Sequence, residues 1–104
     1  MSIYEIQITE PAEKDLNEIG SYIAKELLEP KTAKKMISKI AKVINSLEDM
    51  PLRNALVVDE GLAYRGIRKI MVDNYVVFYI VTTESKKVTI IRILYERRDW
   101  MNLL

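Results

Sequence analysis

The first segment of the chain alternates between apolar and polar residues. Residues 3–9, IYEIQIT, follow the two-residue period of a strand that has one face against a core. The next three residues, Thr9, Glu10 and Pro11, are typical of a helix start. A hydroxyl or carboxylate there can accept hydrogen bonds from free amides, and proline suits the first helical turn. The pattern therefore predicts a strand followed directly by a helix.

Two amphipathic helices are predicted after this strand. Apolar residues recur at steps of three and four from Ala12 to Leu27, and this first helix is expected to end near Glu29 and Pro30. A second apolar stripe runs from Ala33 to Leu47, and lysines occupy the rest of that helix surface. Two helices joined at one proline form a helical hairpin.

The second half of the chain is richer in extended segments. Residues 52–63, LRNALVVDEGLA, have no strong period, and their Val57–Val58 pair fits either a short strand or a buried anchor. Residues 64–72, 75–82 and 87–95 are β-rich and separated by short turns, which predicts an antiparallel meander. The middle segment is apolar on both faces and is expected in the interior of the sheet.

These elements predict an α+β fold in a single domain, residues 1–104. An N-terminal strand and a helical hairpin precede a three-stranded antiparallel meander, which forms a twisted sheet packed on the helices.

Composition narrows the possible chemistry. Of the 104 residues, 49% are hydrophobic and 30% charged, which is enough for a packed core. The chain has no cysteine and no histidine, so thiol nucleophiles, thiolate zinc sites and the commonest general base are excluded. Catalysis would have to use Arg, Lys, Tyr, Asp or Glu, and we expect neither a cofactor nor a metal. Neither a signal peptide nor a membrane span is recognisable, which predicts a cytoplasmic protein.

Charge is unevenly distributed along the chain. Residues 1–60 contain 8 Lys and Arg against 11 Asp and Glu, a balance of −3, whereas residues 61–104 contain 8 against 4, a balance of +4. Such a separation fits a solvated surface, and it equally fits an anion-binding site on the second half.

Several arginines lie on or beside the predicted strands. Arg92 lies inside an otherwise apolar strand, and strict alternation would place it on one face with Val88, Ile90 and Leu94. Because an unpaired buried guanidinium is costly, Arg92 or Arg98 should form a salt bridge unless it faces solvent. The candidate partners are Asp73, Glu96 and Asp99. Clustered arginines also suit recognition of phosphate or carboxylate groups.

Three segments carry a resemblance to a known family. Residues 66–81, GIRKIMVDNYVVFYIV, and residues 88–104, VTIIRILYERRDWMNLL, follow the helical segment at residues 10–23, EPAEKDLNEIGSYI. Together they resemble the RelE/ParE superfamily of bacterial toxins from type II toxin–antitoxin modules. The resemblance spans nearly the whole chain and implies the same α+β fold.

The resemblance points to one branch of this superfamily. Ribonuclease members commonly carry arginine directly after the tyrosine of the middle strand, where this chain has Val76. Gyrase-poisoning members look more similar, with an apolar residue there, an arginine in the last strand as at Arg92, and an Arg-Asp pair as at Arg98–Asp99. The sequence therefore predicts a ParE-like toxin that inhibits DNA gyrase by binding. The residues predicted to bind the target are Arg92, Arg97, Arg98 and Trp100.

Two other functions fit the same resemblance. A ribosome-dependent mRNA endoribonuclease would place cations on the phosphate and use Glu96 as base and Tyr95 as acid. Its cations would be Arg65 or Arg68, Arg92 and Arg97. A non-toxic binding module is the third possibility. Trp100 could also serve only as a lid on the core, together with Leu103 and Leu104.

A cognate antitoxin is the expected protein partner. By resemblance, its flexible C-terminal segment would lay a helix over the hairpin and add a strand to a sheet edge. Lysines of the second helix favour an acidic partner. The residues predicted to bind the antitoxin are Lys35, Lys39 and Lys42.

Overall fold

The computed structural model describes residues 3–57, 60–98 and 100–104 of the chain. Four strands, three α-helices and three short turns of other helix types make up this part. The strands are β1 (Glu5–Ile8), β2 (Ile67–Val72), β3 (Tyr75–Thr82) and β4 (Lys87–Tyr95). The α-helices are α1 (Glu10–Ser21), α2 (Pro30–Ser46) and α3 (Glu60–Tyr64). The other turns are the π-helical η1 (Tyr22–Glu26) and the 3-10 helices η2 (Pro51–Arg53) and η3 (Trp100–Asn102).

The strands form one four-stranded sheet in the order β1-β4-β3-β2. β2, β3 and β4 pair antiparallel, as the predicted meander requires, and the turn between β2 and β3 contains Asp73 with a φ of 53°. β1 pairs parallel with β4, from Glu5 opposite Lys87 to Ile8 opposite Ile90. The predicted α+β fold is confirmed, and the sheet is mixed because the N-terminal strand adds to the meander.

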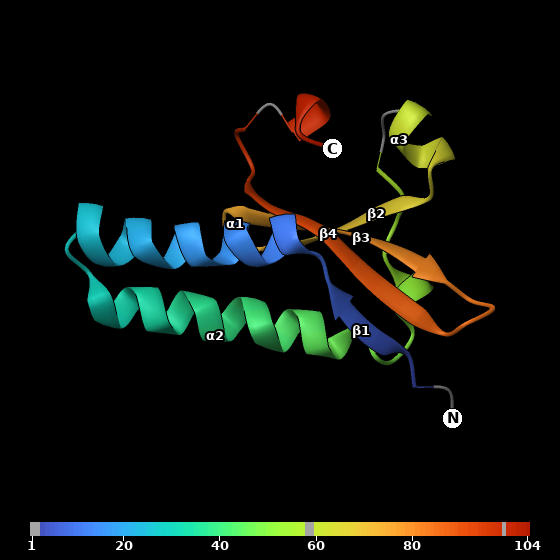
Figure 1. Cartoon of the computed structure of the whole chain (residues 1–104), viewed down its shortest axis with the longest axis horizontal. Coiled ribbons are helices and arrows are strands. Elements are labelled where there is room, and N and C mark those ends of the chain that lie inside the picture. Colours follow the sequence, from blue (N-terminus) through green and yellow to red (C-terminus); the bar gives the residue numbers. More distant parts are fainter. Residues whose placement is uncertain (1–2, 58–59, 99) are drawn as a thin grey trace.

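The helical hairpin packs on one face of the sheet (Figure 1). Thr9 caps α1, since its hydroxyl accepts a hydrogen bond from the amide of Ala12 at 3.3 Å and donates one to the carbonyl of Ile90 at 2.8 Å. This capping residue therefore attaches the start of α1 to β4. Gly20 lets the helices approach closely, because an added Cβ there would lie 3.3 Å from the side chain of Ile37.

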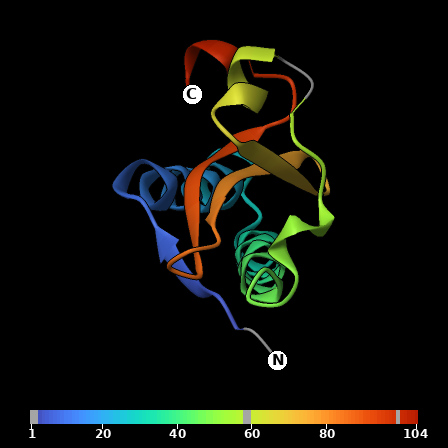
Figure 2. The same ribbon diagram turned by 90° about the vertical axis from the view of Figure 1, so that its right-hand side faces the viewer.

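The opposite face of the sheet is covered by α3 and the C-terminal segment, which lie side by side in Figure 2. Beneath them is a second buried cluster formed by Val57, Leu62, Ile67, Val76, Phe78 and Leu94. Residues 52–63 were expected to have no regular structure beyond the valine pair, yet they include most of α3. Val57 is a buried anchor beside a single bridge between Leu56 and Arg68, and Val58 lies outside the described residues.

A β-bulge in β4 changes which face its side chains occupy. Tyr79 pairs with Ile90 and Phe78 pairs with Arg92, which leaves Ile91 as the extra residue on β4. Phe78 and Tyr79 are neighbours on β3 and point to opposite faces, so Arg92 and Ile90 do too. The predicted shared face of Arg92 with Val88 and Ile90 is therefore wrong.

Candidate functional site

Asp15 and Arg92 form a partly buried ion pair between α1 and β4. The Asp15 carboxylate accepts hydrogen bonds from Arg92 Nε at 2.6 Å, from Arg92 Nη2 at 2.7 Å and from the amide of Ile93 at 3.0 Å. β1 ends opposite Ile90, so Asp15 supplies an acceptor to β4 just past the end of its neighbouring strand. These hydrogen bonds raise the pKa of the Arg92 guanidinium above its ordinary value. Arg92 therefore pairs with Asp15 and not with the predicted Asp73 or Glu96, and the third predicted partner, Asp99, lies outside the described residues.

Two arginines also hold the end of the chain. Arg92 Nη1 donates a hydrogen bond to the carbonyl of Leu103 at 3.1 Å, and Arg65 Nη1 donates one to the carbonyl of Leu104 at 3.0 Å. Trp100 packs against Phe78 with ring centroids 5.1 Å apart, as expected of a lid on the core. The C-terminal segment is thus attached to the sheet by both polar and aromatic contacts.

The other cations of the sheet and of α2 differ in what they contact. Arg68 Nη1 donates hydrogen bonds to the carbonyls of Asn54 at 2.6 Å and Leu52 at 3.5 Å. Lys39 forms an exposed salt bridge with Asp73 at 2.9 Å. The remaining two lysines predicted to bind an antitoxin, Lys35 and Lys42, are exposed on α2.

An exposed basic turn follows β4. We use this term for Glu96, Arg97 and Arg98, all three of which are exposed. The backbone is fixed at both ends of the turn, because the Glu96 amide donates to the Asn74 carbonyl and the Arg98 amide to the Tyr95 carbonyl. Within the described residues, neither arginine side chain of this turn has a hydrogen bond or ion pair. Asp99 lies outside those residues.

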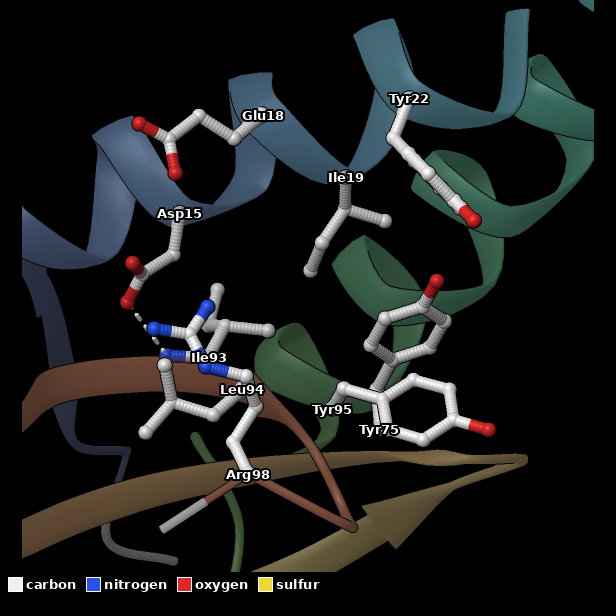
Figure 3. Close-up of a pocket in the computed structure, with 9 residues that line it drawn as sticks. All are labelled: Asp15, Glu18, Ile19, Tyr22, Tyr75, Ile93, Leu94, Tyr95 and Arg98. Carbon is white, nitrogen blue, oxygen red and sulfur yellow. Dashed lines mark hydrogen bonds between the residues drawn. The ribbon is translucent and has the colours of Figure 1, made fainter. Parts of the chain in front are cut away.

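A pocket of about 520 Å³ lies between α1 and the end of β4, next to the basic turn. Three tyrosine rings face it, as Figure 3 shows: Tyr22 from the start of η1, Tyr75 from β3 and Tyr95 from β4. Tyr75 and Tyr95 meet edge to face with centroids 5.8 Å apart. We call this pocket the tyrosine groove; its lining residues are Asp15, Glu18, Ile19, Tyr22, Tyr75, Ile93, Leu94, Tyr95 and Arg98.

The tyrosine groove has an aromatic end and a charged end. Burial raises the pKa of the Tyr75 hydroxyl above 10.0, and the nearby Tyr95 and Tyr22 raise it further. Tyr75 therefore stays a neutral hydrogen-bond donor at physiological pH. At the other end, Figure 3 shows the Arg98 side chain extending from the turn toward Asp15.

The sequence predicted only some of the residues of this site. Tyr95 and Arg98 were singled out, but Asp15, Tyr22 and Tyr75 were not assigned to any site. Helical periodicity does offer a signal for Asp15, because it lies among the apolar positions of α1 directly before Leu16. No group of three or more metal-ligating side chains occurs in the part of the chain that the structure describes. None of the helices described there is long and apolar enough to cross a membrane.

Solved structures of toxins share this fold. One comes from the chromosomal ParDE toxin–antitoxin system of P. aeruginosa, with a TM-score of 0.73, 21% identity, and coverage of 89% of this chain and 96% of that chain. A mutant of the E. coli toxin RelE in the free state matches with a TM-score of 0.68 and 16% identity, covering 97% and 92% respectively. The RelBE2 toxin–antitoxin complex from Mycobacterium tuberculosis matches with a TM-score of 0.64 and 20% identity, covering 91% and 93%. No curated protein sequence matches the chain.

The fold is thus that of the RelE/ParE toxins. A family model for the ParE toxin of the type II toxin–antitoxin system parDE matches residues 6–100. The chain belongs to this family of ParE toxins, which confirms the predicted superfamily and places the chain in its ParE branch.

Proposed function

We propose that this toxin inhibits DNA gyrase by binding to it, and that a cognate antitoxin neutralises it. The protein would act as a single toxin domain in the cytoplasm. The observation that carries the proposal is the basic turn, which presents two arginine side chains without partners among the described residues on a fixed backbone. Exposed arginines on a rigid scaffold suit a protein target that carries carboxylate or phosphate groups.

The hydrogen bonds of the arginines on the sheet support inhibition by binding rather than catalysis of RNA cleavage. The endoribonuclease alternative needs Arg65 or Arg68 and Arg92 free to contact a phosphate, yet each donates to a main-chain carbonyl, and Arg92 is also paired with Asp15. Tyr95, the proposed acid, lies in the tyrosine groove. Val76, at the position where ribonuclease members carry arginine, is buried in the second core cluster.

A cognate antitoxin is proposed because similar structures include toxin–antitoxin complexes from P. aeruginosa, M. tuberculosis and Pyrococcus horikoshii. Lys35 and Lys42 are exposed and remain candidates for contact with an acidic partner. Lys39 is a weaker candidate, since a partner would have to replace its bond to Asp73.

Two assays with the purified protein separate the target hypotheses. The first follows supercoiling by gyrase, and the second follows cleavage of mRNA on ribosomes. We expect inhibition of supercoiling and intact message. Cleavage of ribosome-bound message at defined codons, with supercoiling unaffected, would contradict the proposal and support the endoribonuclease alternative. Arg65→Gln and Arg68→Gln serve as controls, because the alternative predicts loss of cleavage in at least one of them.

A further inference from the structure

One edge of the sheet is open. β1, the dark blue arrow in Figure 2, forms the border of the sheet next to β4, and within the described residues no strand pairs with its outer side. The opposite border, β2, is partly covered, because the Val57 amide donates to the Ile67 carbonyl at 3.0 Å and Leu56 forms a bridge with Arg68. An open edge strand presents unpaired amides and carbonyls to which another strand can add. β1 is therefore the edge at which this sheet can be extended.

The hydrogen bonds of β1 show which of its backbone groups face outward. The amides of Glu5 and Thr9 donate to main-chain carbonyls on the β4 side of the strand, at 2.8 Å and 3.1 Å. Because the direction of hydrogen bonding alternates along a strand, Ile6 and Ile8 direct their amides and carbonyls away from β4. Tyr4 has the same parity, but its amide already donates to a carbonyl just after α2 at 2.9 Å. The open stretch of the edge therefore consists of Ile6 and Ile8.

The side chains of this edge favour an apolar neighbour on one face. Ile8 is 45% exposed, whereas Ile6, which lies on the same face, packs against the main core cluster. Glu5 and Gln7 are exposed on the other face. The strand contains neither lysine nor proline, which commonly prevent the addition of a further strand. A strand that pairs here should place an apolar side chain beside Ile8.

A second copy of β1 meets these requirements. If two copies pair antiparallel about a two-fold axis at Gln7, Ile6 of one copy lies opposite Ile8 of the other. The outward amides and carbonyls of both isoleucines then bond to one another, and the exposed face of Ile8 is covered by an apolar side chain. The two Gln7 side chains meet at the axis, and Glu5 lies opposite Thr9 of the second copy. No like charges face each other in this pairing.

The neighbouring symmetric registers are less favourable. An axis at Glu5 would place two carboxylates directly opposite each other, which destabilises a strand pair. An axis at Ile6 would require the amide of Tyr4, which is already bonded to the segment after α2. An axis at Ile8 would place Ile6 opposite Glu10, which is part of α1. The register centred on Gln7 is thus the one that uses the whole open stretch.

We infer that two copies of this chain associate through their β1 strands, which pair antiparallel about Gln7 and join the two sheets into one. The interface is small, because only two residues of each copy contribute free backbone groups, and we expect a dissociation constant of about 10–100 μM. The basic turn follows the end of β4, whereas β1 pairs with residues 87–90 at its start. The open edge does not include the proposed gyrase contact, and the inference does not depend on the proposed function.

Cross-linking at the two-fold axis tests the register. The chain has no cysteine, so Gln7→Cys introduces a single thiol. Opposed residues of a non-hydrogen-bonded antiparallel pair have Cα atoms about 4.5 Å apart, which a disulfide can span. At about 100 μM protein under mild oxidation, we expect most Gln7→Cys protein to become a disulfide-linked dimer. Glu5→Cys is the control, because position 5 is equally exposed but lies opposite Thr9 and should stay largely reduced. Equal cross-linking of both variants, or none in Gln7→Cys, would overturn the inference.

Analytical ultracentrifugation tests association without a cross-link. The unmodified protein should change from monomer to dimer as its concentration rises from about 1 μM to about 1 mM. Gln7→Glu should raise the dissociation constant at least about tenfold, because it places two carboxylates at the axis. Glu5→Gln is the matched control and should leave the dissociation constant unchanged, since it changes charge at a neighbouring exposed position. A protein that stays monomeric up to about 1 mM would overturn the inference and leave the edge open to a strand of another protein. Equal weakening by both variants would also overturn it.

Discussion

Arg92 and Arg98 are separated by only five residues in the chain, yet they lie in opposite environments. Arg92 is partly buried and bonded to Asp15 and to the carbonyl of Leu103, whereas Arg98 is exposed and has no side-chain partner among the described residues. The first arginine joins α1, β4 and the C-terminal segment. The second extends from a turn whose backbone is already fixed. The comparison teaches that Arg92, whose hydrogen bonds stabilise the fold, is less available to bind another protein than the exposed Arg98.

The largest expected effect concerns the buried side of this comparison. Arg92→Ala should lower the free energy of unfolding by about 3–5 kcal/mol, because it leaves the nearly buried carboxylate of Asp15 without its cation. Asp15→Ala should cost less, since the Arg92 side chain is 22% exposed and can turn toward water. Urea denaturation measures both. Losses below about 1 kcal/mol in both variants would show that the pair contributes little.

Trp100→Ala should have the next largest effect. A fully buried aromatic costs roughly 3–5 kcal/mol when truncated, and we expect about 2 kcal/mol here because Trp100 is only half-buried against Phe78. Toxicity in cells should fall together with thermal stability. Trp100→Phe is the control, since it keeps an aromatic ring on Phe78. Full loss of toxicity in Trp100→Phe at unchanged stability would instead place the indole in the target interface.

Tyr79 should make stability depend on alkaline pH. Its hydroxyl is buried, donates to the carbonyl of Pro51 at 2.7 Å and accepts from Asn54 at 3.0 Å. Burial raises the pKa of Tyr79 above 10.0 despite the Asn54 hydrogen bond. A raised folded-state pKa means that this stabilisation is complete below the unfolded pKa of about 10 and is lost as pH rises through the folded value.

The Tyr79→Phe variant tests whether ionisation of Tyr79 lowers stability at alkaline pH. It should lose about 1 kcal/mol near neutral pH through the missing hydrogen bonds. Its stability should also fall less than that of the unmodified protein between about pH 9 and pH 11. Urea midpoints across this range provide the comparison. An equal alkaline loss in both proteins would show that other groups cause it.

The exposed salt bridge of α2 should contribute less. Lys39→Gln should lower stability by about 0.2–1 kcal/mol at most, because both Lys39 and Asp73 are about half exposed and solvent screens the pair. Reversal of Lys35, Lys39 and Lys42 to glutamate should weaken binding of the cognate antitoxin, which calorimetry can measure. Unchanged antitoxin affinity would identify this helix face as solvated surface.

The periodicity of the sequence was sufficient to predict the strands and the helical hairpin, because each depends on local alternation and on turn residues. It was not sufficient for Arg92. The bulge at Ile91 shifts the face of every later residue in β4, and no residue type there distinguishes a bulge from regular alternation. Asp15 was missed as the partner because it is 77 residues away and the contact depends on where α1 crosses β4.

The candidate site, like the fold, could be predicted only in part from the sequence. Arg97 and Arg98 were predicted to bind the target from the resemblance, and the structure leaves both side chains exposed just after the last strand. The tyrosine groove could not be predicted, since its rings come from three separate elements and meet only once the hairpin lies on the sheet. Resemblance to a family indicated the fold and the kind of protein. Only the structure showed which arginines form internal hydrogen bonds and which are exposed.

The central claim is that the exposed arginines of the basic turn bind the target, whereas Arg92 stabilises the fold. Its most direct test is gyrase supercoiling in the presence of Arg97→Ala or Arg98→Ala protein, with thermal unfolding followed on the same samples. Because both side chains are exposed, stability should change by no more than about 0.5 kcal/mol. We predict that at least one variant needs about tenfold more protein for half-inhibition, which corresponds to loss of a single charged contact. Full inhibition by both variants at unchanged stability would contradict the account and direct attention to the sheet arginines.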